Sequence, residues 1–95
     1  MKYAVVTGAS SGMGLEFARQ LAERKYGIVI VSNQPEENRR VAEMLRRQNH
    51  VDVRVIDMDL TLPKAAEDIY QQVTSWELEV EVLVSNAGML LFSTL

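Results

Sequence analysis

The sequence predicts an α/β protein built on a parallel β-sheet, and three observations lead to this fold class. Four short apolar stretches rich in β-branched residues have the length of buried strands. The segments between them repeat apolar residues at helical spacing. No linker, internal repeat or low-complexity segment interrupts this alternation, so each helix must cross over the sheet to reach the next parallel strand.

The four expected strands cover residues 2–6 (KYAVV), 28–32 (IVIVS), 53–57 (VRVID) and 81–85 (EVLVS). Their apolar residues mostly follow one another instead of alternating with polar ones, a pattern typical of strands covered on both faces. The last seven residues, MLLFSTL, fit neither pattern clearly and receive no assignment.

Three helices are expected between these strands. Gly27 suits the C-terminal end of the first helix, and Pro35 and Pro63 suit the first turns of the second and third. Glu36 and Glu37 lie where the positive end of the second helix dipole favours carboxylates. The expected apolar faces comprise, helix by helix, Met13, Phe17, Ala18, Leu21 and Ala22; Val41, Ala42 and Leu45; and Ala66, Ile69, Tyr70, Val73 and Trp76.

Composition excludes several classes of protein. The net charge is -3 and the sequence pI is about 5.1, with Lys and Arg scattered along the chain, so we expect neither a nucleic-acid nor a membrane partner. The chain has no cysteine, which excludes disulfides and thiolate metal sites and favours a cytoplasmic location. The start MKYAVVTG enters a strand pattern directly, so we expect Met1 to be the native start without a signal peptide.

The segment TGASSGMG, residues 7–14, joins the first strand to the first helix. Unpaired N–H groups at a helix N-terminus, together with the helix dipole, form a site for anions. We expect Gly8 to make a tight turn, Gly12 to let a phosphate approach the main chain, and Gly14 to let the helix pack against the sheet. The hydroxyls of Thr7, Ser10 and Ser11 surround the same hollow. The alternative is a glycine-rich turn without a ligand.

The spacing Gly-x-x-x-Gly-x-Gly after Thr7 resembles the glycine motif of the short-chain dehydrogenase/reductase family. Two further motifs follow in the family's order: DLT at residues 59–61 and NAG at residues 86–88, where Ser85 replaces the asparagine that usually comes first. The resemblance covers essentially the whole chain. It implies a three-layer Rossmann-like sheet with strand order 3-2-1-4, truncated so that residues 1–95 form the NAD(P)-binding portion and the C-terminal catalytic portion is absent.

The resemblance also implies a set of cofactor-binding residues. The Asp59 carboxylate would meet the adenine amino group, the main chain of Leu60 would meet a ring nitrogen, and residues 86–88 would line the adenosine. Asp57 is expected to be solvated or to cap a helix. The complete set is Gly8, Ser10, Ser11, Gly12, Met13, Gly14, Asn33, Asp59, Leu60, Asn86, Ala87 and Gly88.

The choice between NAD and NADP stays open at this stage. A carboxylate at the end of the second strand would hold both ribose hydroxyls, and an arginine would accept a 2′-phosphate. The chain has the neutral Asn33 there, and Ser11 stands where a basic residue would favour the phosphate. Arg39 and Arg40 lie further into the following helix, where we expect a solvated face.

No catalytic residue is expected in this chain. The family uses a serine and a Tyr-x-x-x-Lys motif, but none of the three tyrosines, Tyr3, Tyr26 and Tyr70, has a lysine four positions later, so we expect them to pack only. His50 is expected in a solvated loop, and no metal site is expected.

The resemblance implies an NAD(P)-dependent oxidoreductase that transfers hydride between an alcohol and a carbonyl substrate. This chain would supply its dinucleotide-binding half and be inactive alone. The alternative is a non-catalytic NAD(P)-binding or interaction module on the same fold. The expected order leaves the fourth strand as an open edge, with Val82 and Val84 partly uncovered. We therefore expect a fragment of a larger reductase, or a homo-oligomer or other assembly that shields the sheet.

Overall fold

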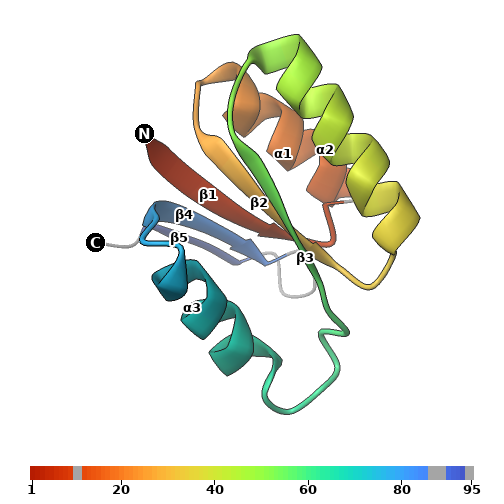
Figure 1. The fold of residues 1–95 in the computed structure, drawn as a ribbon, viewed down its shortest axis with the longest axis vertical. Coiled ribbons are helices and arrows are strands. Elements are labelled where there is room, and N and C mark those ends of the chain that lie inside the picture. Colours follow the sequence, from red (N-terminus) through yellow and green to blue (C-terminus); the bar gives the residue numbers. More distant parts are fainter. Residues whose placement is uncertain (10–11, 86–89, 94–95) are drawn as a thin grey trace.

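The computed structural model describes residues 1–9, 12–85 and 90–93 and contains one five-stranded sheet with three helices in this part of the chain (Figure 1). The elements follow in the order β1 (Lys2–Thr7), α1 (Gly12–Glu23), β2 (Gly27–Ser32), α2 (Pro35–Asn49), β3 (Val53–Asp57), α3 (Ala65–Ser75), β4 (Glu79–Ser85) and β5 (Leu90–Ser93). None of the described helices is long and apolar enough to cross a membrane.

The strand order is β3-β2-β1-β4-β5, and the first four strands are parallel. This confirms the expected α/β class and the order 3-2-1-4. The expectation of an open edge at β4 was wrong, because β5 pairs with it in antiparallel orientation, with Ser85 opposite Leu90. The four residues of β5 lie in the segment that received no assignment. Their pairing occupies the hydrogen-bonding edge that β4 would otherwise leave free.

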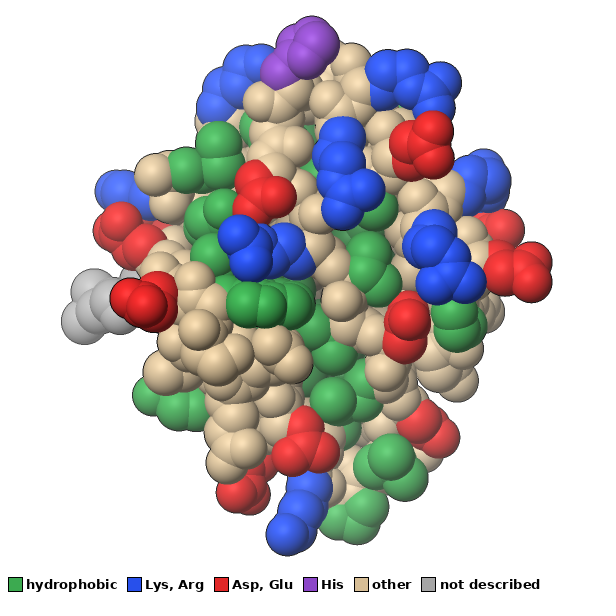
Figure 2. Space-filling model, viewed as in Figure 1, with side chains coloured by type: hydrophobic (Ala, Val, Ile, Leu, Met, Phe, Trp, Pro, Cys, Tyr) green, Lys and Arg blue, Asp and Glu red, His purple; other side chains and the backbone are tan. Residues whose placement is uncertain are grey.

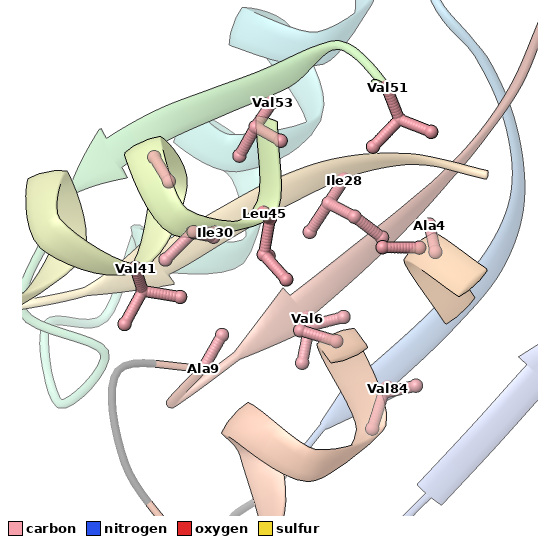
Figure 3. Packing of buried hydrophobic residues seen from close by; sticks show 13 residues of the cluster. Ala4, Val6, Ala9, Ile28, Ile30, Val41, Leu45, Val51, Val53 and Val84 are labelled. Carbon is pink, nitrogen blue, oxygen red and sulfur yellow. The ribbon is translucent and has the colours of Figure 1, made fainter. Parts of the chain in front are cut away.

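The helices cover the two faces of the sheet unequally. Helices α1 and α2 lie on one face, and α3 lies alone on the other (Figure 1). Figure 3 shows Val41 and Leu45 of α2 packed toward the strands on the first face. The fully buried residues of this larger core include Ala4, Val6, Ile28, Ile30 and Leu45. The smaller core under α3 includes Tyr3, Val5, Val29, Val31, Ile56 and Val73.

A β-bulge decides which residues of β4 face each core. Tyr3 pairs with Val80, but Ala4 pairs with Val82, so Glu81 is an extra residue in β4. Val82 is half-buried, as expected, but the expectation for Val84 was wrong because it is 3% exposed in the core of α1 and α2. Val80 and Leu83 instead face α3, where they are half-buried.

Gly27 does not end α1, contrary to expectation. The helix ends at Glu23, and Lys25 adopts the left-handed conformation with φ 70°. The amides of Lys25 and Tyr26 donate to the carbonyls of Ala22 and Leu21, and these bonds close the C-terminal end of the helix before the chain reaches Gly27. Gly27 is instead the first residue of β2.

Pro63 lies just before α3 and not in its first turn, as we had expected. The Ala65 amide donates to the Leu62 carbonyl over 3.1 Å, so Pro63 follows Leu62 inside a turn. Proline suits that turn position because its φ is already fixed at the required value. Pro35 does occupy the first position of α2, as expected.

Candidate functional site

Gly8 and Gly12 lie on either side of the connection between β1 and α1, and Gly8 has the tight-turn conformation that its sequence predicted. Gly8 and Gly12 have φ values of 68° and 62°, in the left-handed region that residues with a side chain rarely adopt. The Gly8 amide donates to the Val31 carbonyl over 2.8 Å, which ties the turn to β2. This bond places Gly8 at the carboxyl ends of β1 and β2.

Gly12 and Gly14 lack side chains for different reasons. A Cβ on Gly12 would meet no described atom within 4 Å, so the space beside it is open. A Cβ on Gly14 would lie 2.1 Å from the carbonyl oxygen of Gly8. At Gly14, α1 therefore lies directly against the backbone of Gly8 and Ala9, which follow β1, and no side chain fits between them.

The side chains around the turn have different roles. Met13 is 56% exposed, as a residue that borders a ligand site can be. The Thr7 hydroxyl was expected in the hollow with the serines, but it is buried and donates to the Val84 carbonyl over 3.3 Å, linking β1 to β4. Ser10 and Ser11 lie outside the described residues, so their predicted roles stay predictions.

The carboxyl end of β2 leads directly into α2. Asn33 is exposed, as a residue that reads a ligand must be. The Gln34 amide donates to the Ser32 hydroxyl oxygen over 3.1 Å, which bends the chain into the helix that begins at Pro35. Arg40 pairs with Glu37 and Arg39 is exposed, in agreement with the expected solvated face.

Asn38 links the ends of β2 and β3 and was missed in the sequence analysis. It is fully buried, and its Nδ2 donates to the Ser32 carbonyl over 3.0 Å and to Asp57 Oδ1 over 2.9 Å. Asn38 precedes Val41, Ala42 and Leu45 by three, four and seven positions. This spacing already placed it on the buried face of the helix, and a polar residue there was the signal that could have identified it.

Asp59 shapes the turn that follows β3. Its Oδ1 accepts hydrogen bonds from the Thr61 hydroxyl over 2.7 Å and the Thr61 amide over 2.9 Å. The bonds from Thr61 lower the pKa of the Asp59 carboxyl, so the group favours the charged form that can accept further bonds. Leu60 beside it is exposed. Asp59 does not cap α3, whose N-cap residue is Lys64.

The structure brings the described site residues to one edge of the sheet. The glycine turn, Asn33 and Asp59 follow β1, β2 and β3, whose carboxyl ends lie together because the strands are parallel (Figure 1). Asn86, Ala87 and Gly88 lie outside the described residues. Ser85 ends β4, which runs parallel to β1, so the chain leaves β4 at the same edge.

The tyrosines and the histidine lie in structural positions. The Tyr3 hydroxyl donates to Asp52 over 2.6 Å and the Tyr26 hydroxyl to Glu81 over 2.7 Å. Burial, and then the bond to Asp52, raises the pKa of Tyr3, while the bond to Glu81 raises that of Tyr26. His50 ends α2 in the left-handed conformation. Among the described residues, no group of three or more His, Cys, Asp or Glu side chains could hold a metal ion.

An apolar hollow lies on the opposite face of the sheet from α1 and α2. Its volume is about 450 Å³, and its lining includes Ile69 and Val73 of α3 and Val80 and Leu83 of β4. Tyr70 borders it and is 72% exposed, so the expectation that this side chain packs was wrong. Most of the described residues that line the hollow are apolar, and none of them carries a charge.

Charged side chains are dispersed over the surface. Figure 2 shows Lys and Arg side chains interspersed with Asp and Glu, with hydrophobic side chains between them. Ion pairs connect several of these residues, including Lys2 with Glu81 and Arg47 with Glu43. This distribution provides no continuous basic surface on the face in view.

Comparison of the sequence with known protein families gives one match that covers nearly the whole chain. The model of the short chain dehydrogenase family matches residues 2–95. The chain is 34% identical over 90 residues to the very-long-chain 3-oxoacyl-CoA reductases of Macaca fascicularis and Rattus norvegicus. These alignments cover 93% of this chain and 28% of each relative, so the chain spans less than a third of their length.

Solved structures give the same result. The L-sorbose reductase of Gluconobacter frateurii, complexed with NADPH and L-sorbose, superposes with a TM-score of 0.85 at 33% identity and covers 92% of this chain and 33% of its own. An alcohol dehydrogenase of Thermococcus sibiricus, complexed with 5-hydroxy-NADP, superposes with a TM-score of 0.81 at 29% identity. That similarity covers 87% of this chain and 35% of the dehydrogenase.

Proposed function

The chain belongs to the short-chain dehydrogenase family, and from this premise we propose that it forms the dinucleotide-binding part of an NAD(P)-dependent oxidoreductase. The observation that carries the proposal is the pair of left-handed glycines: Gly8 precedes α1 and Gly12 begins it, with open space beside Gly12. Main-chain N–H groups at such a helix N-terminus suit a pyrophosphate, which can approach closely only where no Cβ intervenes.

The residues of this chain would bind and orient the cofactor. The glycine turn would hold the pyrophosphate, and Met13 would cover it from the first turn of α1. Asn33 would meet the adenosine ribose, and the Asp59 carboxylate, whose ionised form the bonds from Thr61 favour further, would accept a hydrogen bond from the adenine amino group. The bound dinucleotide would supply or accept the hydride. The names of the related reductases and alcohol dehydrogenase support alcohol and carbonyl compounds as the substrates of the proposed oxidoreductase.

The acid and base for that transfer would come from chain outside these 95 residues. No tyrosine in the sequence has a lysine four positions later. The hydroxyls of Tyr3 and Tyr26 donate to the carboxylates of Asp52 and Glu81. The relatives are more than three times as long as the aligned segment, which leaves room for such groups in a longer protein. A non-catalytic dinucleotide-binding module is the alternative, and the names of the relatives favour the enzyme.

Dinucleotide titration tests this proposal. NADH and NADPH should both be titrated against the chain by fluorescence, with Gly12→Val as the variant and Gln71→Val, on the exposed side of α3, as the control. We expect Gly12→Val to weaken dinucleotide binding at least tenfold, which corresponds to about 1.4 kcal/mol of binding free energy. The valine side chain would occupy the open space where the pyrophosphate is proposed to bind. If a folded Gly12→Val chain bound the dinucleotides as tightly as the wild type, the proposed pyrophosphate site at the glycine turn would be refuted.

We also infer that the apolar hollow under α3 is covered in the assembled protein, by a second copy of the chain or by further residues of a longer one. An exposed Tyr70 beside half-buried Val80 and Leu83 supports this inference, since apolar surface of this kind favours association. Light scattering and thermal melts of the 95-residue chain would test it, and a monodisperse monomer with high thermal stability would contradict it, because the chain would then need no cover over this surface. A cytoplasmic location stays a prediction from composition.

A further inference from the structure

Asn38 places an amide where the helix pattern calls for an apolar side chain. It shares the buried face of α2 with Val41, Ala42 and Leu45 and is itself 0% exposed. Its Oδ1 has no hydrogen-bond partner among the described residues, and a buried carbonyl without a partner costs folding free energy. Leucine has a similar size and would carry no such cost. The presence of an amide therefore points to what its Nδ2 atom does.

The partners of Nδ2 define the orientation of the amide. If the amide were turned over, its oxygen would face the Ser32 carbonyl and the Asp57 carboxylate, which are both acceptors. The Ser32 carbonyl also accepts a bond from the Met58 amide over 3.0 Å, so it has a partner without Asn38. The contribution that only Asn38 makes is the bond that fixes the Asp57 carboxylate beside β2.

Asp57 lies beside the predicted position of the adenosine ribose. It pairs in register with Ser32, the residue directly before Asn33, so the ends of β2 and β3 are adjacent. Asp57 is exposed, which leaves its carboxylate accessible from solvent. A carboxylate at this edge disfavours the 2′-phosphate of NADP, and Asn33 cannot provide one. Asp57 supplies it from the neighbouring strand.

Other charges near this edge do not reverse the effect. The first turn of α2 contains Glu36 and Glu37, and Arg40 pairs with Glu37. Arg39, the remaining cation of this segment, is exposed one turn into the helix. Together with Asp57, the three carboxylates outnumber the two guanidinium groups.

We propose that Asp57 is a specificity-determining residue that favours NAD over NADP, and that Asn38 is the positioning residue that holds it beside β2. This inference rests on the proposed dinucleotide site. It concerns a carboxylate on β3, a strand whose end was not expected to distinguish the two cofactors.

The main test is Asp57→Asn in the 95-residue chain. The control is Asp68→Asn, which changes an exposed aspartate on α3. Asparagine keeps the size of the side chain and can still accept the Asn38 bond through its oxygen. We expect Asp57→Asn to tighten NADPH binding about fivefold, which corresponds to about 1 kcal/mol, and to leave NADH binding within about twofold. The gain should shrink in high salt because screening weakens charge repulsion. Asp68→Asn should change neither affinity.

Asn38→Leu tests the positioning role. We expect its melting temperature to equal or exceed that of the wild type, while its preference shifts toward NADPH as in Asp57→Asn. A lower melting temperature with an unchanged preference would make Asn38 purely structural and overturn its part of the proposal.

Equal responses of NADH and NADPH to Asp57→Asn would overturn the specificity role and leave the proposed function intact. No binding of either dinucleotide to the wild-type chain would overturn both. The two failures are therefore distinguishable.

Discussion

The ring of Tyr3 on β1 fills the space beside Gly27 on β2. The two residues are register partners, and a Cβ on Gly27 would lie 2.4 Å from Cε2 of the tyrosine. The Tyr3 hydroxyl is also held by Asp52, so the ring cannot move away without loss of that bond. Gly27 therefore belongs to the core packing of the sheet and not to the end of α1.

Gly27→Ala is expected to destabilise the chain by about 1–3 kcal/mol, because the added methyl group overpacks a fixed ring. Denaturant unfolding would measure the change. Tyr3→Val removes the ring, and in that background Gly27→Ala should cost much less. A double-mutant cycle with no coupling between the two substitutions would show that the ring is not the cause.

Gly12→Ala and Gly14→Ala should have different effects on stability and binding. At Gly12 a methyl group has free space but the φ of 62° strains it, at a cost of about 1 kcal/mol. At Gly14 the methyl group meets the Gly8 carbonyl, so we expect a loss of about 3 kcal/mol or more. Thermal melts would compare the two. Equal losses of stability in the two variants would contradict the role assigned to Gly14. Dinucleotide affinity should fall in both variants.

Glu77→Gly should stabilise the chain by about 0.5–1 kcal/mol. Glu77 follows α3 with φ 57°, a conformation that glycine adopts without the strain of a Cβ, and its side chain is exposed. Its amide bond to Thr74 is retained in the variant. Gln71→Gly inside α3 is the matched control and should destabilise by about 1 kcal/mol. A loss of stability in both variants would contradict the strain argument.

Acid stability should depend on Asp52. Burial alone would raise the pKa of this carboxyl, but hydrogen bonds from Tyr3 and Arg54 outweigh it, so the pKa is lowered. Its contribution is therefore complete above the unfolded pKa of about 4 and is lost as pH falls through the lower folded value. The melting temperature of Asp52→Asn should fall less steeply below about pH 4 than that of the wild type, and Tyr3→Phe should lie between them. Parallel profiles for all three chains would contradict this role.

The sequence predicted the regular elements because their signals are local. Continuous β-branched runs placed β3 at its observed residues and the other three parallel strands within two residues of theirs. Helix ends were harder, since Lys25 and Glu77 adopt left-handed conformations without a glycine to indicate them. The pairing of β5 depends on which strand lies beside it, and no periodicity in a four-residue run reveals this.

The site was predictable where main-chain conformation requires glycine and not where side chains meet across the sheet. Gly8 has the positive φ that its expected tight turn requires, and open space lies beside Gly12, where a phosphate was expected to approach. The bond between Asn38 and Asp57 joins residues 19 positions apart, and it depends on the register of β2 and β3. Tyr70 was misjudged because an apolar helical face predicts burial only where another element covers it.

The chain alone should show no turnover of an alcohol or carbonyl substrate with NAD(P), even where it binds the dinucleotide. The Tyr3 and Tyr26 hydroxyls are bonded to carboxylates. Burial and then the bond to Asp52 raise the pKa of Tyr3, and the bond to Glu81 raises the pKa of Tyr26, which disfavours the deprotonated form that a base needs. Tyr70 lies exposed on α3, beside the hollow on the other face of the sheet from α1 and α2. Absorbance of NAD(P)H would be followed with a panel of alcohols and ketones, with Tyr70→Phe as the control for the exposed tyrosine. Turnover that survives in Tyr70→Phe but disappears in Tyr3→Phe or Tyr26→Phe would show that a structural tyrosine acts in catalysis, and the assignment of catalysis to chain outside these residues would then fail.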